Sequence, residues 1–277
     1  MLWARVAGIG LLGPGLDGWP AAAEVLRSQG SYRRAATVIP ALAVLPPAER
    51  RRSGRVVRVA LAIGAEAVTA AGADPRRLPS VFTSSGGDGD NCHEICVTLA
   101  GSERQISPTR FHNSVHNAAA GYWSIAYGCT EPSTALCAYD GSFGAGLLEA
   151  LAQLACGAEA TLLVSYDLDY PPPLRSHRPI GDAFGVALLL RRAGQEPAAH
   201  PEPAADPAPP AAPRLCVDFT DAAPTAMADA ALEALRREIP AARALPLLEL
   251  LAAERGGRVV LDYLQGTRLE VQLEAGT

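Results

Sequence analysis

The 277-residue chain contains no lysine, and all 24 of its basic residues are arginine. This absence excludes a Schiff-base enzyme and a P-loop nucleotide site, because both need a lysine amine. Nowhere does an apolar run reach the ~18 residues of a membrane span. No excess of positive charge is present either: the net charge is −5, and the arginines are scattered apart from RRSGRVVR at 51–58, interpreted as the solvated start of a helix. We therefore expect a cytoplasmic protein that neither crosses a membrane nor binds nucleic acid.

What the sequence does contain is a large apolar fraction, 49%, in alternating strand-like and helix-like segments. This alternation, with nearly continuous apolar strands, predicts an α/β protein whose sheet is covered on both faces. The expected strands are 4–12, 79–85, 133–140, 160–167, 184–192, 214–219, 258–264 and 267–274. The expected helices are 19–28, 46–71, 92–100, 112–128, 144–157, 225–238 and 244–254.

One segment interrupts this pattern. Residues 194–213 are rich in proline and alanine without apolar periodicity, which predicts an extended connection. It separates residues 1–193 from residues 214–277. Because so short a final segment holds only a marginal core alone, we expect it to complete the fold of the first.

Cys92, Cys96, His112 and His116 have the order and rough spacing of a zinc site. Each pair is spaced i, i+4 and can present two ligands on one helical face. However, the cysteines fall on a predicted helix instead of a hairpin, inside a domain that needs no metal to fold. Packed cysteines and hydrogen-bonded or interface histidines are the favoured interpretation, so no metal and no cofactor is expected.

Four segments resemble the N-terminal half of the β-ketoacyl synthases of the thiolase superfamily. They are VAGIGLLGPG (6–15), VRVALAIGAEAVTAAGADP (57–75), TSSGGDGDNCHEI (83–95) and ISPTRFHNSVHNAAAGYWSI (106–125). The last two are more closely similar to the chain-length-factor-like subunits of aryl polyene synthesis. The resemblance covers roughly residues 4–192 and implies a thiolase-like fold, with a ketosynthase N-terminal lobe and a reduced C-terminal lobe.

The catalytic cysteine of that family is missing from the corresponding position. In catalytic members it stands eight residues after the proline of a Gly-Pro pair, and here the residue eight after Pro132 is Asp140. Cys137 lies at an odd offset and so points to the other face of the predicted strand. We expect Asp140 to accept backbone N–H groups at the helix start, because a carboxylate is a poor nucleophile toward a thioester. The two histidines that catalytic members take from a second lobe are also missing, since only His200 follows His177. The resemblance therefore implies no intrinsic activity.

The resemblance further implies a heterodimer with a catalytic β-ketoacyl synthase subunit, served by an acyl carrier protein, in polyene, polyketide or fatty-acid-like chain elongation. The strand at 133–140 would pair edge to edge across the interface, and the histidines would serve this interface. The predicted interface residues are Phe111, His112, Asn113, His116 and Asn117. Residues lining the acyl tunnel would be large and apolar, with Tyr122, Trp123 and Tyr139 as candidates.

Two alternatives stay open. The chain could act alone, as a homodimeric acyl-binding or carrier-docking module of the same fold. The turn YDGSFGAG could instead be a nucleophile elbow with Ser142 as the attacking residue of a serine hydrolase, although it lacks the glycine two residues before the serine and a well-placed histidine.

Overall fold

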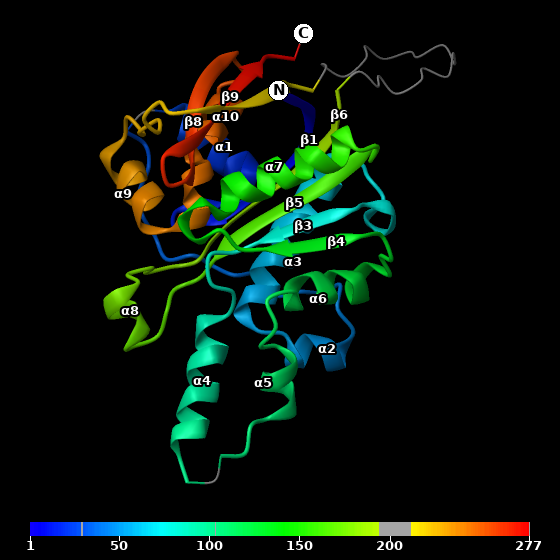
Figure 1. Ribbon diagram of the computed structural model, residues 1–277, viewed down its shortest axis with the longest axis vertical. Coiled ribbons are helices and arrows are strands. Elements are labelled where there is room, and N and C mark those ends of the chain that lie inside the picture. The colour runs from blue at the N-terminus through cyan, green and yellow to red at the C-terminus, as the bar shows by residue number, and fades with distance from the viewer. Residues whose placement is uncertain (29, 103, 194–211, 277) are drawn as a thin grey trace.

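A computed structural model describes residues 1–28, 30–102, 104–193 and 212–276 of the chain (Figure 1). The described strands form one nine-stranded sheet in the order β4-β3-β5-β6-β1-β7-β9-β8, with β2 paired to β1. β3 runs parallel to β4 and β5, and the remaining pairs are antiparallel. The strands are β1 (Leu2–Gly13), β2 (Leu16–Asp17), β3 (Ser80–Thr83), β4 (Ser133–Leu136), β5 (Ala160–Asp167), β6 (Phe184–Arg192), β7 (Arg214–Thr220), β8 (Gly257–Leu264) and β9 (Thr267–Glu274).

Helices cover both faces of this sheet. The α-helices are α1 (Trp19–Arg27), α2 (Pro47–Arg52), α3 (Arg55–Ala70), α4 (Gly89–Ala100), α5 (Pro108–His112), α6 (Ala118–Tyr127), α7 (Ser142–Ala155), α8 (Leu174–His177), α9 (Ala230–Glu238) and α10 (Leu245–Ala252), and the 3₁₀ turns are η1 (Pro75–Arg77), η2 (Tyr139–Gly141) and η3 (Pro240–Ala244). One core cluster joins α1, α7, η3 and α10 to the sheet, and a second joins α3 and α6 to it. Central strands β5 and β6 are therefore buried along almost their whole length, as their apolar sequences require.

The last part of the chain adds to the sheet that its first strand begins. β7 pairs with the N-terminal half of β1, with Leu2 opposite Val217, and β9 and β8 follow outward from it. Most of the predicted connection at 194–213 lies outside the described residues. The sequence on either side of that connection thus contributes to one continuous sheet.

Among the predicted elements whose bounds differ in the structure, four differ most. The helix predicted over 46–71 is two helices, because Gly54 is extended between α2 and α3, and glycine and serine are poor helix residues. The helix predicted from 112 begins only at Ala118, since Asn and Ser side chains at 113–117 favour turns. The strand predicted over 133–140 ends at Leu136, and the helix predicted from 225 begins at Ala230.

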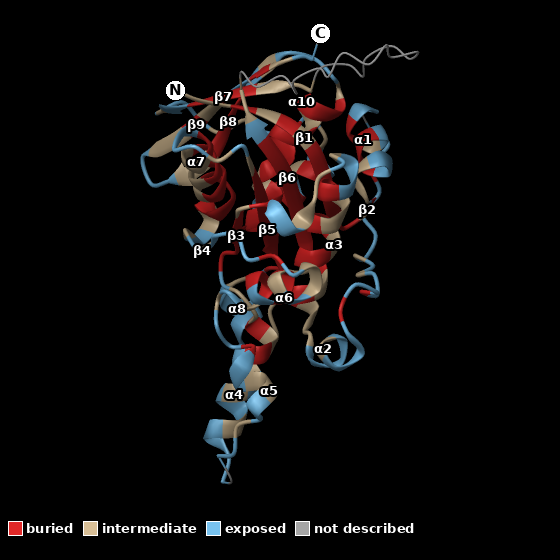
Figure 2. Ribbon diagram, turned by 90° about the vertical axis from the view of Figure 1, so that its right-hand side faces the viewer, coloured by how far each residue is buried: buried red, intermediate tan, exposed pale blue. Residues whose placement is uncertain are grey.

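α4 and α5 project away from the sheet as an arm (Figures 1 and 2). Only Gly89 and Asn91 of α4 are buried. Helices of this length depend on packing for most of their stability, so the arm is held mainly at its base.

Candidate functional site

The site is built on the turn between β4 and α7. β4 ends at Leu136 and α7 begins at Ser142, so five residues reverse the chain from strand to helix. Within this turn Tyr139 has a φ of 53°, a strained value for a residue with a side chain. A sharp, strained strand-to-helix turn is the geometry of a nucleophile elbow. The strained residue is Tyr139, one position before Asp140, and neither residue carries a thiol or an aliphatic hydroxyl.

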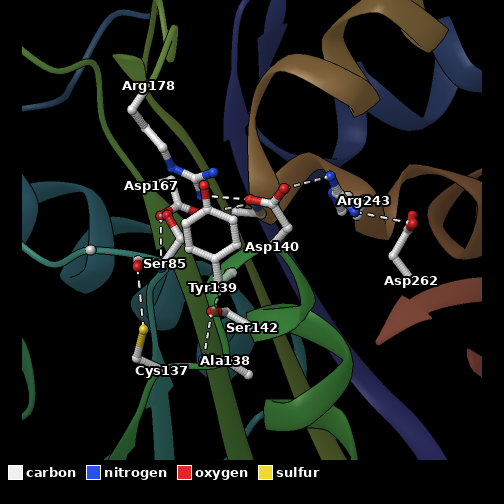
Figure 3. Close-up of polar contacts among 12 residues, drawn as sticks. Ser85, Cys137, Ala138, Tyr139, Asp140, Ser142, Asp167, Arg178, Arg243 and Asp262 are labelled. Carbon is white, nitrogen blue, oxygen red and sulfur yellow. Dashed lines mark hydrogen bonds and ion pairs between the residues drawn. The ribbon is translucent and has the colours of Figure 1, made fainter. Parts of the chain in front are cut away.

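Ser142 holds this turn closed. Its Oγ accepts the Ala138 N–H at 3.0 Å and donates to the Tyr139 carbonyl oxygen at 2.6 Å (Figure 3). The residue is 1% exposed. The hydrolase interpretation needs an accessible hydroxyl that is hydrogen-bonded to a base, so it is wrong on both counts.

β8 passes directly against the turn. A Cβ placed on Gly141 would lie 2.0 Å from the Tyr263 carbonyl oxygen, and one placed on Gly144 would lie 2.7 Å from that of Asp262. Glycine at these positions is therefore required by close backbone approach.

Asp140 lies between two arginines. Its Oδ2 accepts a hydrogen bond from Arg243 at 3.0 Å. Its Oδ1 lies 2.5 Å from Arg178, which makes an ion pair whose angles are not those of a hydrogen bond. The N-terminal end of α7 has no side-chain cap. The prediction that Asp140 caps this helix is therefore wrong: the carboxylate is neutralised by two guanidinium groups instead.

These contacts continue into the C-terminal part of the chain. Arg243 also pairs with Asp262 at 3.0 Å, and Asp262 pairs with Arg236 at 2.7 Å. Arg236 then pairs with Glu233 at 2.8 Å. Charges alternate along this series, which we call the elbow ion network: Arg178, Asp140, Arg243, Asp262, Arg236 and Glu233. It contains three guanidinium groups and three carboxylates, and the exposed Arg237 adds a fourth guanidinium 3.8 Å from Glu233.

Tyr139 is presented outward at the start of the network. Tyr139 is 62% exposed, although its backbone has the strained positive φ of the turn. The Arg178 guanidinium lies 3.8 Å from the centre of its ring, a cation–π contact (Figure 3). Arg178 therefore contacts both Tyr139 and Asp140.

A second carboxylate, Asp167, lies beneath the turn and was missed by sequence reasoning. It ends β5, is 3% exposed, and accepts hydrogen bonds from the Ser85 N–H at 2.8 Å, the Ser85 Oγ at 2.6 Å and the Ala241 N–H at 2.9 Å. Burial raises its pKa to about 6 despite these donors. An acidic residue ending an otherwise apolar strand was the one signal available.

The thiol of Cys137 points toward the same region. Its Sγ lies 3.2 Å from the Ser85 carbonyl oxygen, to which it donates. A neighbouring base or cation activates a thiol by favouring its thiolate form, whereas a carbonyl oxygen accepts the proton of the neutral thiol.

The five predicted interface residues divide into two groups. Phe111 is 68% exposed, and His112 and Asn117 are exposed too. Asn113 and His116 face inward: the Asn113 Nδ2 donates to the Arg52 carbonyl oxygen at 2.8 Å, and the His116 Nε2 lies 3.3 Å from the Ser84 carbonyl oxygen. Three of the five are therefore available to a partner.

The predicted tunnel residues also divide. Tyr122 and Trp123 are each 1% exposed and belong to the core between α3, α6 and the sheet. The Trp123 ring packs 4.4 Å from that of Tyr127, centre to centre. A tunnel along these two side chains would require that core to open, whereas Tyr139 already stands at the surface.

The zinc alternative gains no support from the described residues. Cys92 and Cys96 lie exposed on α4, and no group of three His, Cys, Asp or Glu side chains in the described ranges is placed to hold a metal ion.

Comparison with known proteins identifies the family. The sequence model for the N-terminal domain of β-ketoacyl synthases matches residues 24–245. No curated protein sequence matches the chain significantly. The chain belongs to the β-ketoacyl synthase family, as its sequence motifs predict.

Solved structures of this family share the fold. One is a chain of the complex of the ketosynthase ApeO with its chain length factor ApeC from Xenorhabdus doucetiae (TM-score 0.72, 20% identity, covering 98% of this chain and 100% of that one). A second comes from the ishigamide ketosynthase/chain length factor (TM-score 0.73, 16% identity, 100% of both chains). A third comes from AntDE:AntF, a type II acyl carrier protein in complex with its ketosynthase (TM-score 0.69, 12% identity, 99% of both chains). Among the helices described here, none has the length and apolar character to span a membrane.

Proposed function

We propose that this chain is a non-catalytic, chain-length-factor-like subunit that pairs with a catalytic β-ketoacyl synthase and helps to shape its acyl tunnel. The main support for a non-catalytic role is the turn between β4 and α7. It has the strained geometry that presents a nucleophile, but it holds Tyr139 and Asp140, and the Asp140 carboxylate is bound by Arg178 and Arg243. A carboxylate held between two cations is a still weaker nucleophile than a free one.

The sheet supports a partner at β4. Successive residues of a strand direct their backbone groups to opposite sides, and the carbonyl oxygens of Pro132 and Leu136 bond to β3. Ser133 and Ala135 therefore direct their N–H and C=O groups away from the sheet. The middle of the opposite edge is engaged within the chain, since Val260 of β8 exchanges hydrogen bonds with Thr225. An open edge strand is a template for pairing with another chain.

Exposed apolar side chains lie on the turn after β4, on α6 beside it and on the segment that leads into α6. Four of them are each about half exposed or more: Phe111 68%, Val115 53%, Ile125 48% and Tyr139 62%. They lie on α5, α6, the loop between these helices and the turn after β4, and α6 packs beside β4 (Figure 1). Aromatic residues on an exposed patch are the usual anchors of a protein interface. We call this surface the β4 face.

The similar structures are consistent with this pairing, because two of them are ketosynthase and chain-length-factor assemblies and a third contains an acyl carrier protein. By the resemblance of residues 83–95 and 106–125, we propose an aryl-polyene-type system, with an acyl carrier protein delivering the growing chain to the catalytic subunit.

The proposal is tested by pull-down of the tagged protein from its native lysate, followed by native mass spectrometry. We expect a one-to-one complex with a cysteine-bearing ketosynthase. Phe111→Glu and Ala135→Pro should abolish it, because the first places a charge in the β4 face and the second removes an outward N–H group. Val38→Glu is the matched control, since Val38 is 72% exposed and lies beside the start of β6, away from this face. A homodimer that both variants leave intact would refute the proposal, and a homodimer disrupted by them would favour the stand-alone module.

A further inference from the structure

A second site lies away from the elbow, where α2 ends and α3 and α4 begin. A cavity of about 440 Å³ opens there, bordered also by α5. Apart from Gly54 the lining residues are polar or charged, and four of them are arginines: Arg52, Arg55, Arg58 and Arg110. We call this cavity the arginine pocket. Arginines are the most numerous residues in this lining, so a polar, anionic ligand suits it better than an acyl chain.

Two buried amides fix the walls of the pocket. Asn91 is 8% exposed and its Nδ2 donates to the Arg110 carbonyl oxygen at 2.8 Å. Asn113 is 9% exposed and joins α2 to the segment after α5 through the Arg52 carbonyl oxygen. Because buried polar side chains are retained only where they are hydrogen-bonded, these links hold the three walls together without a ligand.

Arg55 already forms ion pairs with two carboxylates. It pairs with Asp169 at 2.6 Å and with Asp90 at 3.3 Å, so this arginine is oriented and neutralised by its neighbours. Asp88, the other acidic residue of the lining, caps α4 by accepting the Asn91 N–H at 2.9 Å. These carboxylates line the α4 side of the pocket, so an anion must be held from the opposite side.

Arg52 and Arg110 form only weak, exposed ion pairs. Each has one ion pair at 3.3 Å, Arg52 with Glu49 and Arg110 with Glu94. Three of the four side chains are more than 40% exposed, and exposed pairs of this kind contribute little stability. Both guanidinium groups can exchange such a partner for a stronger anion at small cost.

Arg58 is the unmatched group. In the described part of the chain it forms no ion pair, and its Nε is buried without a hydrogen-bond partner. It lies one turn into α3, a 16-residue helix whose N-cap, Gly54, supplies no side-chain cap. Gly54 also borders the pocket, but the Asp88 Oδ2 lies 3.0 Å from where a Gly54 Cβ would stand, so a carboxylate already faces this helix start and the unmatched charge is that of Arg58.

We propose that the arginine pocket binds a phosphoryl group, carried by a small phosphate monoester or as free phosphate. Arg58 supplies the unmatched charge, and Arg52 and Arg110 supply forked donors that suit phosphate oxygens. This inference does not depend on the proposed pairing with a ketosynthase, because the pocket lies at the base of the arm and involves neither the elbow turn nor β4.

The test is calorimetric titration of the full-length protein with inorganic phosphate and with glycerol 3-phosphate, at fixed ionic strength in KCl, with glycerol as the neutral comparison. We expect both phosphates to bind and glycerol not to bind. Arg58→Gln should weaken binding about tenfold, as the loss of one charge-assisted contact predicts. Arg77→Gln is the matched control, since Arg77 is an exposed arginine beyond the far end of α3.

Comparison of the two ligands also distinguishes a site for phosphate monoesters from a site for free phosphate. Tighter binding of glycerol 3-phosphate than of inorganic phosphate indicates a monoester site, and equal binding indicates recognition of the phosphoryl group alone. If Arg58→Gln does not fold, amide chemical shifts of the unmodified protein decide, because phosphate must then perturb residues 52–58 and 107–113 selectively. Phosphate that binds no better than chloride, or equally to the Arg58 and Arg77 variants, overturns the proposal.

Discussion

At the scale of single residues, two carboxylates near the elbow turn have opposite surroundings. Asp140 lies between two guanidinium groups, whereas Asp167 is buried among neutral donors from Ser85 and Ala241. Neutral donors do not fully replace water around an anion, which is why burial dominates and the pKa of Asp167 rises. The sequence showed both aspartates at strand ends but not these partners, because Arg243 and Ala241 lie far along the chain.

Asp167 makes stability depend on pH in a defined direction. Its pKa is about 6 in the folded protein against an ordinary value of 3.8, so the folded state favours the protonated form. The stabilisation is complete below about pH 4 and is lost as pH rises through 6. Between pH 4 and 7 we expect this group to lower the free energy of unfolding by up to about 3 kcal/mol.

Urea denaturation of the wild type and of Asp167→Asn across this range checks the prediction. The variant carries no titrating group at 167, so the difference between the two curves isolates the effect. At pH 4 the variant should be less stable than the wild type by about 1–3 kcal/mol, because its single amide oxygen cannot accept from both the Ser85 N–H and the Ala241 N–H. The gap should narrow as the pH rises to 7, because only the wild type loses stability. Parallel curves from pH 4 to 7 would contradict the prediction.

At the scale of elements, the turn between β4 and α7 depends on contact with β8. Gly141→Ala would place a methyl group against the Tyr263 carbonyl oxygen, in a space of 2.0 Å. Because both sides of the contact are backbone, β8 and the turn must separate, and we expect a loss of about 2–4 kcal/mol in the free energy of unfolding.

Gly121→Ala on α6 is the matched substitution. A Cβ at Gly121 meets nothing within 4 Å, so better helix propensity should stabilise the protein by about 0.5–1 kcal/mol. Chemical denaturation of both variants gives the comparison. Equal effects of the two substitutions would show that the close approach of β8 is not what requires glycine at 141.

The elements themselves were predicted unequally well. β6 and β9 have the predicted bounds, since an apolar run or strict alternation between turn signals leaves little choice of register. The α2–α3 break was missed because Arg-rich flanks made Ser53 and Gly54 look like part of one helix. In the site, the missing thiol was visible in sequence. The elbow ion network was not, because its members come from four distant segments.

At the scale of the whole molecule, the fold class and the family were predicted from local motifs, and both are confirmed. One sheet runs through the entire described chain, and the two core clusters share its strands β1, β3, β5 and β6. The elbow ion network adds a polar link between the N-terminal and C-terminal parts. No boundary in the described packing separates these parts.

We therefore expect a single cooperative unfolding transition. Trp3, Trp19 and Trp123 lie in β1, α1 and α6, so fluorescence reports on both layers of helices, while far-UV circular dichroism reports on the whole backbone. The two signals should give coincident denaturation curves. Separate midpoints would show that the C-terminal segment unfolds on its own.

The two edges of the sheet also bear on how large an assembly can become. β8 exchanges hydrogen bonds with Thr225, whereas the outward groups of Ser133 and Ala135 on β4 meet no strand among the residues described. A subunit that is adhesive at both edges can add neighbours without end and grow into a fibre. A subunit with one open sheet edge can pair with one partner strand only, so its assembly stops at two subunits. By occupying the middle of the β8 edge, Thr225 disfavours the addition of a second strand partner there.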